Sequence, residues 1–225
     1  MTQAPTRCVL FDLDGTLADT APDLGAALNR VLEEEGLAPL PMEATRPVTS
    51  QGVRGLLRVG LGIGPDDINY QSLAQRVLKH YAAGICRHTR LFDGMPDVLA
   101  TLESRGIKWG IVTNKHARFT EPLVDALGLM QRAACVISGD SAAHPKPHPA
   151  PLLMACERAN VAPTHCIYVG DDLRDIQAGK AAGMRTIAAA WGYLGESEAI
   201  HEWCADHIAP TPETLLDVVF GINVQ

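Results

Sequence analysis

Apolar residues in this chain follow two patterns that alternate along its length. Short continuous runs are typical of strands buried in a parallel sheet, whereas apolar residues three or four positions apart are typical of amphipathic helices. The short runs predict strands at Val9–Phe11, Trp109–Val112, Cys135–Ile137, His165–Val169 and Thr186–Ala190, with a short sixth at Ala205–Ile208. The helical spacing predicts helices at Met95–Arg105, Phe119–Leu127, Ala150–Ala159, Asp175–Ala182 and Pro212–Phe220. This alternation predicts a doubly wound α/β fold with a parallel sheet between two helical layers.

Residues 20–86 interrupt the alternation because they carry helical spacing and no strand signal. They predict a helix from Pro22 to Gly36, a proline-rich connector, and further helices at Gln51–Leu61 and Asp66–Cys86. We interpret residues 20–88 as an inserted all-helical domain. Residues 1–19 and 89–225 then form the α/β core domain.

Composition narrows the class of protein. The chain has 225 residues, 47% hydrophobic and 20% charged, which is ordinary for a globular protein with a full core. Its net charge of −7 argues against nucleic-acid and membrane partners but permits a small anionic substrate. No signal peptide or membrane span is expected. The six cysteines are scattered without a Cys-x-x-Cys pair, which indicates free thiols and a cytoplasmic protein. The pattern gives no indication of oligomeric state.

Polar residues stand where four of the predicted strands end. They are Asp12 and Asp14, Thr113 and Asn114, the loop residue Lys146, and Asp171 with Asp172. Because the carboxyl ends of parallel strands meet at one edge of the sheet, these groups are expected to converge. Carboxylate oxygens suit Mg²⁺, and a hydroxyl, backbone amides and an ammonium suit a tetrahedral oxyanion. The set predicts phosphoryl-transfer chemistry.

The first strand end suggests roles for its two acids. Asp12 and Asp14 would point to opposite sides of a continuing strand, so Gly15 must bend the chain if both are to reach one site. Asp12, at the strand tip, is the candidate nucleophile that would form an aspartyl-phosphate. Asp14 is the candidate general acid to the leaving oxygen and then base to water.

Four segments in order, DLDGTLADT, VTN, the lysine of HPKPHP, and GDDLRD, resemble the motifs of the haloacid dehalogenase superfamily of phosphatases. The resemblance implies a Rossmann-like core with a helical C1-type cap inserted after the first motif. It implies Asp12 as nucleophile and Asp14 as acid and base, with Mg²⁺ held by Asp12, the Asp14 backbone carbonyl and Asp171. It also implies that Thr113 and the Asn114 amide bind phosphate, that Lys146 stabilises it, and that Asp175 or Asp172 supports the metal indirectly.

Within the superfamily the chain resembles the phosphoglycolate phosphatase-like group. Stretches such as VTSQGVRGLL and GDDLRDIQAGKAAGMRT look closer to its N-acetylmuramic acid 6-phosphate phosphatase branch. Both substrates are small phosphorylated metabolites that also carry a carboxylate, so a cation from the cap is expected. Arg54 is the candidate, with the loop Ser50 to Gly52 facing the core site; Arg46 and Arg58 are alternatives.

Other interpretations stay open at this point. Thr113 and Asp172 could each be a helix N-cap, and Arg54 could be part of a solvated helix face. A sugar phosphomutase would share the first motif with a phosphatase. A non-catalytic binding domain is the third possibility, although the complete set of charged residues argues against it.

Overall fold

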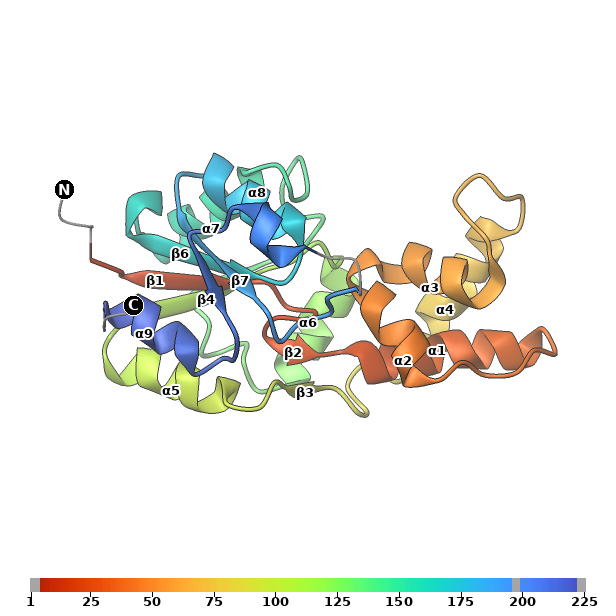
Figure 1. The fold of residues 1–225 in the computed structure, drawn as a ribbon. Coiled ribbons are helices and arrows are strands. Elements are labelled where there is room, and N and C mark those ends of the chain that lie inside the picture. The colour runs from red at the N-terminus through yellow and green to blue at the C-terminus, as the bar shows by residue number, and fades with distance from the viewer. Residues whose placement is uncertain (1–4, 196–198, 222–225) are drawn as a thin grey trace.

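The computed structural model describes residues 5–195 and 199–221, and a six-stranded parallel sheet organises that part of the chain (Figure 1). The strand order is β5-β4-β1-β6-β7-β8, so β1 and β6 lie at the centre. The strands are β1 (Cys8–Phe11), β4 (Lys108–Val112), β5 (Val136–Ile137), β6 (Cys166–Gly170), β7 (Arg185–Ala189) and β8 (His207–Ala209). This arrangement confirms the predicted doubly wound α/β class.

Helices cover both faces of the sheet (Figure 1). One face packs against α5 (Met95–Ser104), α6 (Ala117–Ala126) and α9 (Thr214–Phe220). The other packs against α7 (Ala150–Ala159) and α8 (Leu173–Ala181). Successive residues of a strand point to opposite faces, so Phe11 belongs to the first core and Leu10 to the second. Both are fully buried, which explains why this strand reads as an unbroken apolar run.

A separate group of helices follows β1 and extends to one side of the sheet (Figure 1). It contains α1 (Ala21–Glu34), α2 (Met42–Thr45), the 3₁₀ helix η1 (Arg46–Gln51), α3 (Gly52–Leu61) and α4 (Tyr70–Ala83), which we call the cap. Its apolar faces form their own core, in which Leu28, Leu56 and Val77 are fully buried. No helix among the described residues has the length and apolarity needed to cross a membrane.

Two chain segments connect the cap to the sheet, and they lie side by side. They form a small antiparallel ribbon of β2 (Ala18–Asp19) and β3 (Arg90–Leu91), with Ala18 opposite Leu91. Asp23 in α1 ties the second segment to the first, because its carboxylate accepts hydrogen bonds from the backbone N–H groups of His88 and Thr89. The ribbon consists of residues that flank the predicted insertion of residues 20–88 on both sides, and the division into two domains stays a prediction.

Most predicted elements are present, with ends shifted by a few residues. The predicted connector contains α2 and the beginning of η1, which sequence periodicity did not indicate because each is too short to show a repeat. The short strands β2 and β3 were also not predicted, and their pairing is a tertiary contact. The predicted core segments 1–19 and 89–225 include residues 1–4, 196–198 and 222–225, which lie outside the described residues.

Candidate active site

The polar strand ends meet in a cavity of about 370 Å³ between the sheet edge and the cap. Its charged and polar lining from the core consists of Asp12, Asp14, Thr113, Asn114, Lys115, His116, Arg118, Lys146, Asp172, Arg174 and Asp175. The cap contributes residues of η1 and α3, including Ser50, and apolar side chains of α1 and α4. The parallel strands therefore bring together groups more than 150 positions apart in the chain.

Asp12 follows β1 directly, and its backbone N–H still donates to Val169 O at 2.9 Å, as a strand residue would. The side chain is almost buried, and Lys146 Nζ lies 2.8 Å from Asp12 Oδ1 as an ion-pair partner. Apart from this ion pair, Asp12 Oδ1 has no hydrogen-bond partner among the residues that the structure describes. A buried carboxylate oxygen with unused acceptor capacity is suited to a ligand or a cation.

Lys146 is held by four groups and has little freedom. Its ammonium donates to Val112 O at 3.1 Å, to the Tyr168 hydroxyl at 2.8 Å and to Asp175 Oδ1 at 2.7 Å, besides its contact with Asp12. Burial favours the neutral amine, but the Asp12 and Asp175 carboxylates outweigh it and raise the pKa of Lys146. The site therefore keeps a fixed positive charge beside Asp12.

Asp171, which directly follows β6, and Asp175 in α8 complete an acidic group with Asp12. One carboxylate oxygen from each lies within 4.8 Å of the others. Burial and the two neighbouring carboxylates raise the pKa of Asp171 well above its usual range. Burial also raises the pKa of Asp175 to about 7, although Lys146 acts in the opposite direction. Three carboxylates lie beside only one ammonium, so a divalent cation would stabilise this group by balancing its negative charge. Carboxylate oxygens are ligands that fit Mg²⁺.

Gly15 makes the predicted bend, with a φ of +85°. A Cβ at this position would collide with the Asp171 carboxylate, so the turn needs glycine for space as well as for conformation. Beyond the bend, Asp14 Oδ1 accepts a hydrogen bond from Thr20 Oγ1 at 2.5 Å and pairs with Lys115. The bend directs both Asp12 and Asp14 into the cavity.

Thr113 and Asn114 follow β4 at the cavity wall. Thr113 is not the N-cap of α6, because that position belongs to His116 and Thr113 Oγ1 instead accepts from the Lys115 backbone N–H at 3.1 Å. The Asn114 side chain exchanges two hydrogen bonds with the backbone of Lys146, at 2.9 and 3.0 Å. Asn114 therefore fixes the loop that carries Lys146.

Asp172 is the N-cap of α8 and forms a capping box with Asp175. Its carboxylate also pairs with the Arg174 side chain at 2.7 Å, and this pairing lowers the pKa of Asp172 against the opposing effect of burial. Asp172 is thus occupied by α8 and Arg174 and stands outside the acidic group. Of the two roles that the sequence left open for Asp172, the structure shows the N-cap.

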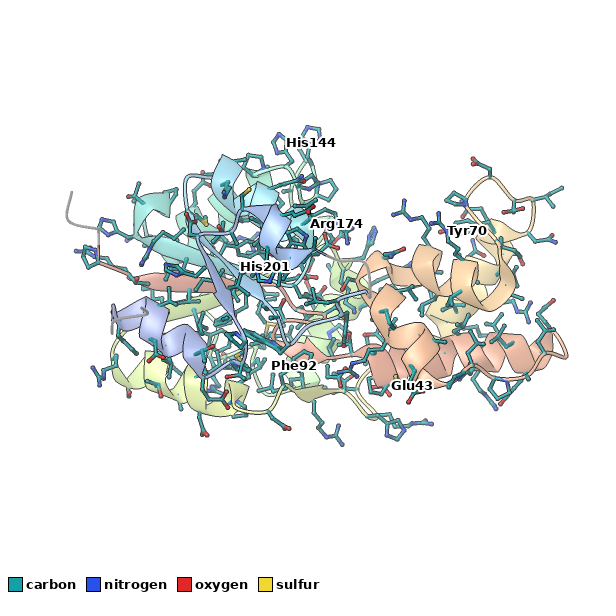
Figure 2. All side chains as sticks on the ribbon, in the orientation of Figure 1. Glu43, Tyr70, Phe92, His144, Arg174 and His201 are labelled. Atoms are coloured by element: carbon teal, nitrogen blue, oxygen red, sulfur yellow. The ribbon has the colours of Figure 1, made fainter. Side chains whose placement is uncertain are left out.

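The cap reaches the core through Ser50 and Arg174. Ser50 Oγ donates to Asp171 Oδ2 at 3.2 Å, and Arg174, labelled at the junction of cap and sheet in Figure 2, donates to Ser50 O at 2.8 Å. Gly52 also lines the cavity, as expected for the loop that faces the core. Arg54 is exposed and is not among the residues found to line the cavity, so its role in substrate binding stays a prediction. Arg46 instead pairs with Asp19 near the ribbon.

The sequence did not identify Lys115, Arg174 or Tyr81 as site residues. Lys115 follows directly after Thr113 and Asn114, and that position could have indicated it. Arg174 sits inside the GDDLRD motif. Tyr81 comes from the cap helix α4, and only the packing of cap on core brings it to the cavity.

Comparison with known proteins shows which family this chain resembles. The family model "Haloacid dehalogenase-like hydrolase" matches residues 9–189. A phosphoglycolate phosphatase of Xanthomonas campestris pv. campestris is 46% identical over 93% of this chain and 94% of its own. An N-acetylmuramic acid 6-phosphate phosphatase of Pseudomonas putida is 39% identical over 95% of this chain and 96% of its own. The crystal structure of a predicted phosphoglycolate phosphatase from Haemophilus somnus superposes with a TM-score of 0.83 at 25% identity, covering 97% of this chain and 99% of the other.

Proposed function

This chain belongs to the haloacid dehalogenase-like hydrolase family and is a phosphatase, and we propose that it hydrolyses the phosphate ester of a small carboxylated metabolite through a phosphoaspartate on Asp12. The observation that carries the proposal is the environment of Asp12. Its carboxylate lies at the cavity wall, and the one partner of its Oδ1 among the described residues is the Lys146 ammonium at 2.8 Å. Phosphoglycolate and N-acetylmuramic acid 6-phosphate are the two substrates we favour, in line with the sequence resemblance.

The donor set fits Mg²⁺ as cofactor. We propose that Asp12, Asp171 and the Asp14 backbone carbonyl hold it, and that Asp175 supports the site by fixing Lys146. Hydrogen bonds from Thr16 Oγ1 at 2.8 Å and from the Tyr193 backbone N–H at 2.9 Å orient the Asp171 carboxylate. When bound, Mg²⁺ would neutralise the carboxylates and draw charge from the phosphate.

The protein groups supply the bond changes. Asp12 attacks phosphorus, so that an Asp12–phosphorus bond forms while the bond from phosphorus to the ester oxygen breaks. Asp14 donates a proton to that leaving oxygen and then accepts one from the water that hydrolyses the phosphoaspartate. The Thr113 hydroxyl, the Asn114 N–H and the Lys146 ammonium bind the phosphate oxygens and stabilise their charge.

The cap would exclude water during both transfers. The contacts of Ser50 and Arg174 hold it against the core in the present arrangement. We propose that it opens about the two connecting segments, Leu17–Thr20 and Thr89–Asp93, which meet in the β2–β3 ribbon.

Cations near the cavity would bind the substrate carboxylate. Arg54 remains our candidate for an arrangement in which the cap shifts, whereas Arg118 lines the cavity as it stands and stacks over Phe119 with its guanidinium 4.6 Å from the ring centroid. Arg54→Ala and Arg118→Ala separate the two possibilities. The arginine that binds the carboxylate should raise KM for carboxylated substrates far more than for p-nitrophenyl phosphate, and equal effects on both substrates would remove that arginine from the proposal.

The main test measures phosphate release from a panel of phosphate esters with and without Mg²⁺. Wild type should release phosphate from carboxylated substrates only with the metal, and chelation should abolish turnover. Asp12→Asn should keep the fold and lose turnover, so substantial residual activity would refute the nucleophile assignment. Conversion of glucose 1-phosphate to an isomer without free phosphate would identify a phosphomutase instead. No phosphate from any ester would favour a binding domain.

A further inference from the structure

Lys115 is a cation of the cavity to which the proposed reaction gives no role. It directly follows Thr113 and Asn114 along the chain, and its side chain is 9% exposed. The ammonium forms an ion pair with Asp14 Oδ1, on the carboxylate that we assign as acid and base. A partly buried pair is screened far less than an ion pair on the surface, so the charge of Lys115 acts strongly on Asp14.

The backbone of Lys115 is fixed by three hydrogen bonds within the core. Its N–H donates to Thr113 Oγ1 at 3.1 Å. Its carbonyl oxygen accepts from the Gly139 N–H at 2.8 Å and from Thr120 Oγ1 at 3.0 Å. A Cβ on Gly139 would lie 2.2 Å from Asn114 O, so glycine is needed for this close approach. The Lys115 side chain therefore starts from a fixed point in the cavity wall.

The ammonium end of Lys115 is held by Tyr81, which belongs to the cap helix α4. Lys115 Nζ lies 5.0 Å from the centroid of the Tyr81 ring, and Lys115 is also the hydrogen-bond partner of the Tyr81 side chain. Tyr81 is 1% exposed, and its ring contacts that of Phe119 with the centroids 5.7 Å apart. Burial disfavours the charge, but Asp14 and Tyr81 outweigh it and raise the pKa of Lys115, so the ammonium stays charged.

The contacts of Asp14 engage one of its two carboxylate oxygens. Lys115 Nζ and Thr20 Oγ1, the latter at 2.5 Å, both contact Oδ1. Within residues 5–195 and 199–221 no hydrogen bond to Asp14 Oδ2 is found. Thr20 lies before α1 and Lys115 after β4, so two separate segments fix the rotation of this carboxylate. A general acid must lie within hydrogen-bond distance of the atom that takes its proton, so this rotation controls proton transfer.

We propose that Lys115 is a positioning residue for proton transfer, which holds Asp14 Oδ1 so that Oδ2 faces the leaving oxygen of the phosphate ester. This inference rests on the proposed function, in which Asp14 is the acid and base. The proton passes from Asp14 Oδ2 to the ester oxygen while the bond from phosphorus to that oxygen breaks, and the electron pair of that bond stays with the oxygen. Lys115 touches no reacting atom and acts through Asp14 alone.

The proposal makes the effect of Lys115 depend on the leaving group of the substrate. An alcohol needs a proton as it leaves, whereas p-nitrophenol leaves readily as its anion, and phenol lies between the two. Glycerol 3-phosphate, phenyl phosphate and p-nitrophenyl phosphate represent these three cases, and none of them carries a carboxylate. The quantity to compare is kcat/KM, because it covers the steps up to departure of the alcohol or phenol and excludes the later hydrolysis of the phosphoaspartate.

Lys115→Met keeps most of the side-chain volume and removes the ammonium. A positioned acid contributes about 10²–10⁴-fold, so we expect kcat/KM to fall about thirtyfold on glycerol 3-phosphate, about threefold on p-nitrophenyl phosphate and by an intermediate factor on phenyl phosphate. Lys79→Met, on the exposed surface of α4, is the matched control and should change none of these values.

Two outcomes for Lys115→Met would overturn the inference. An equal loss on all three esters would show that Lys115 binds the phosphate or supports the fold. A loss confined to phosphoglycolate, which carries a carboxylate, would show that Lys115 binds that group. The phenyl and p-nitrophenyl esters differ by one nitro group, so their ratio decides the question even if glycerol 3-phosphate is not hydrolysed.

A double variant tests whether Lys115 acts through Asp14. Asp14→Asn alone should change the ratio of kcat/KM between p-nitrophenyl and phenyl phosphate at least as much as Lys115→Met does. Lys115→Met added to Asp14→Asn should change that ratio by less than about twofold, because the group that it positions has already lost its acid function. A further change as large as the one in wild type would overturn the inference.

Lys115→Gln keeps a hydrogen-bond donor without the charge, and it replaces Lys115→Met if that variant does not fold. It should change the same ratio in the same direction by about threefold, and an unchanged ratio would overturn the inference. If wild type hydrolyses no ester, or if Asp12→Asn keeps turnover, the proposed function fails and the inference fails with it. If wild type hydrolyses the esters through Asp12 and the Lys115 variants lower all of them equally, the proposed function stands and the inference fails.

Discussion

Removal of the Lys146 ammonium should destabilise the metal-free protein strongly. Lys146 is 4% exposed and lies between the carboxylates of Asp12 and Asp175, at 2.8 and 2.7 Å. Lys146→Met keeps most of the volume of the side chain and deletes the charge. It leaves two buried carboxylates without their cation and also removes the hydrogen bond that Lys146 donates to the Tyr168 hydroxyl.

The size of the stability loss in Lys146→Met depends on how the carboxylates of Asp12 and Asp175 respond to the missing ammonium. Removal of one partner from a buried ion pair typically costs about 3–5 kcal/mol. Asp175 limits this cost, because its pKa is already raised to about 7 and it can take up a proton once Lys146 is gone. We therefore expect a loss of about 3 kcal/mol in the free energy of unfolding, which is a fall of roughly 6–12 °C in Tm for a chain of this size.

Urea unfolding with a chelator at pH 7.5 measures the effect. Lys180→Met, on the exposed surface of α8, is the control for loss of a lysine and should change the free energy of unfolding by less than about 0.5 kcal/mol. The double variant Lys146→Met/Asp175→Asn should recover about 1 kcal/mol or more, because one unpaired charge is removed as well. A loss below about 1 kcal/mol for Lys146→Met, or a double variant no more stable than the single one, would refute the reasoning.

Three further outcomes are expected. Gly15→Ala should reduce turnover of p-nitrophenyl phosphate at least tenfold, because alanine is unfavourable in the left-handed conformation and its Cβ would displace Asp171. Gly106→Ala is the control, since Gly106 has a φ of +69° with open space around it, and should leave turnover unchanged. Similar activity of the two variants would contradict this prediction. In the metal-free folded protein, Asp171 and Asp175 keep protons that they release near pH 4 in the unfolded chain, because their pKa values are raised on folding. The free energy of unfolding should therefore fall as pH rises from about 4 to 7. Asp171→Asn should reduce this pH dependence in urea unfolding, and an unchanged dependence would count against the raised pKa of Asp171. Tyr193→Phe leaves the backbone N–H groups of Thr20 and Ala21 without their acceptor and should lower the free energy of unfolding in urea by about 1–3 kcal/mol. A variant as stable as wild type would show that the hydrogen bonds of Tyr193 contribute nothing.

The sequence by itself determined the fold class and predicted which polar residues gather at the candidate site. Buried strands such as β1 appear as unbroken apolar runs because both of their faces are covered, and polar residues stand out where those runs stop. Topology then requires that the ends of neighbouring parallel strands meet at one edge. For this reason the sequence pattern alone places Asp12, Thr113, Lys146 and Asp171 in one group. The need for a bend at Gly15 followed from the alternation of side chains along a strand.

Only the tertiary structure decided what faces the substrate beyond the phosphate. Tyr81 and Arg54 both stand on amphipathic cap helices, and sequence periodicity cannot tell which reaches the cavity, because that depends on how the cap rests on the core. The structure brings Tyr81 and Lys115 to the cavity and leaves Arg54 exposed. It also shows that Asp172 is engaged by α8 and Arg174, a choice that depends on side-chain partners. Local pattern thus determines the strands and their ends, whereas specificity depends on packing between segments that are distant in the chain.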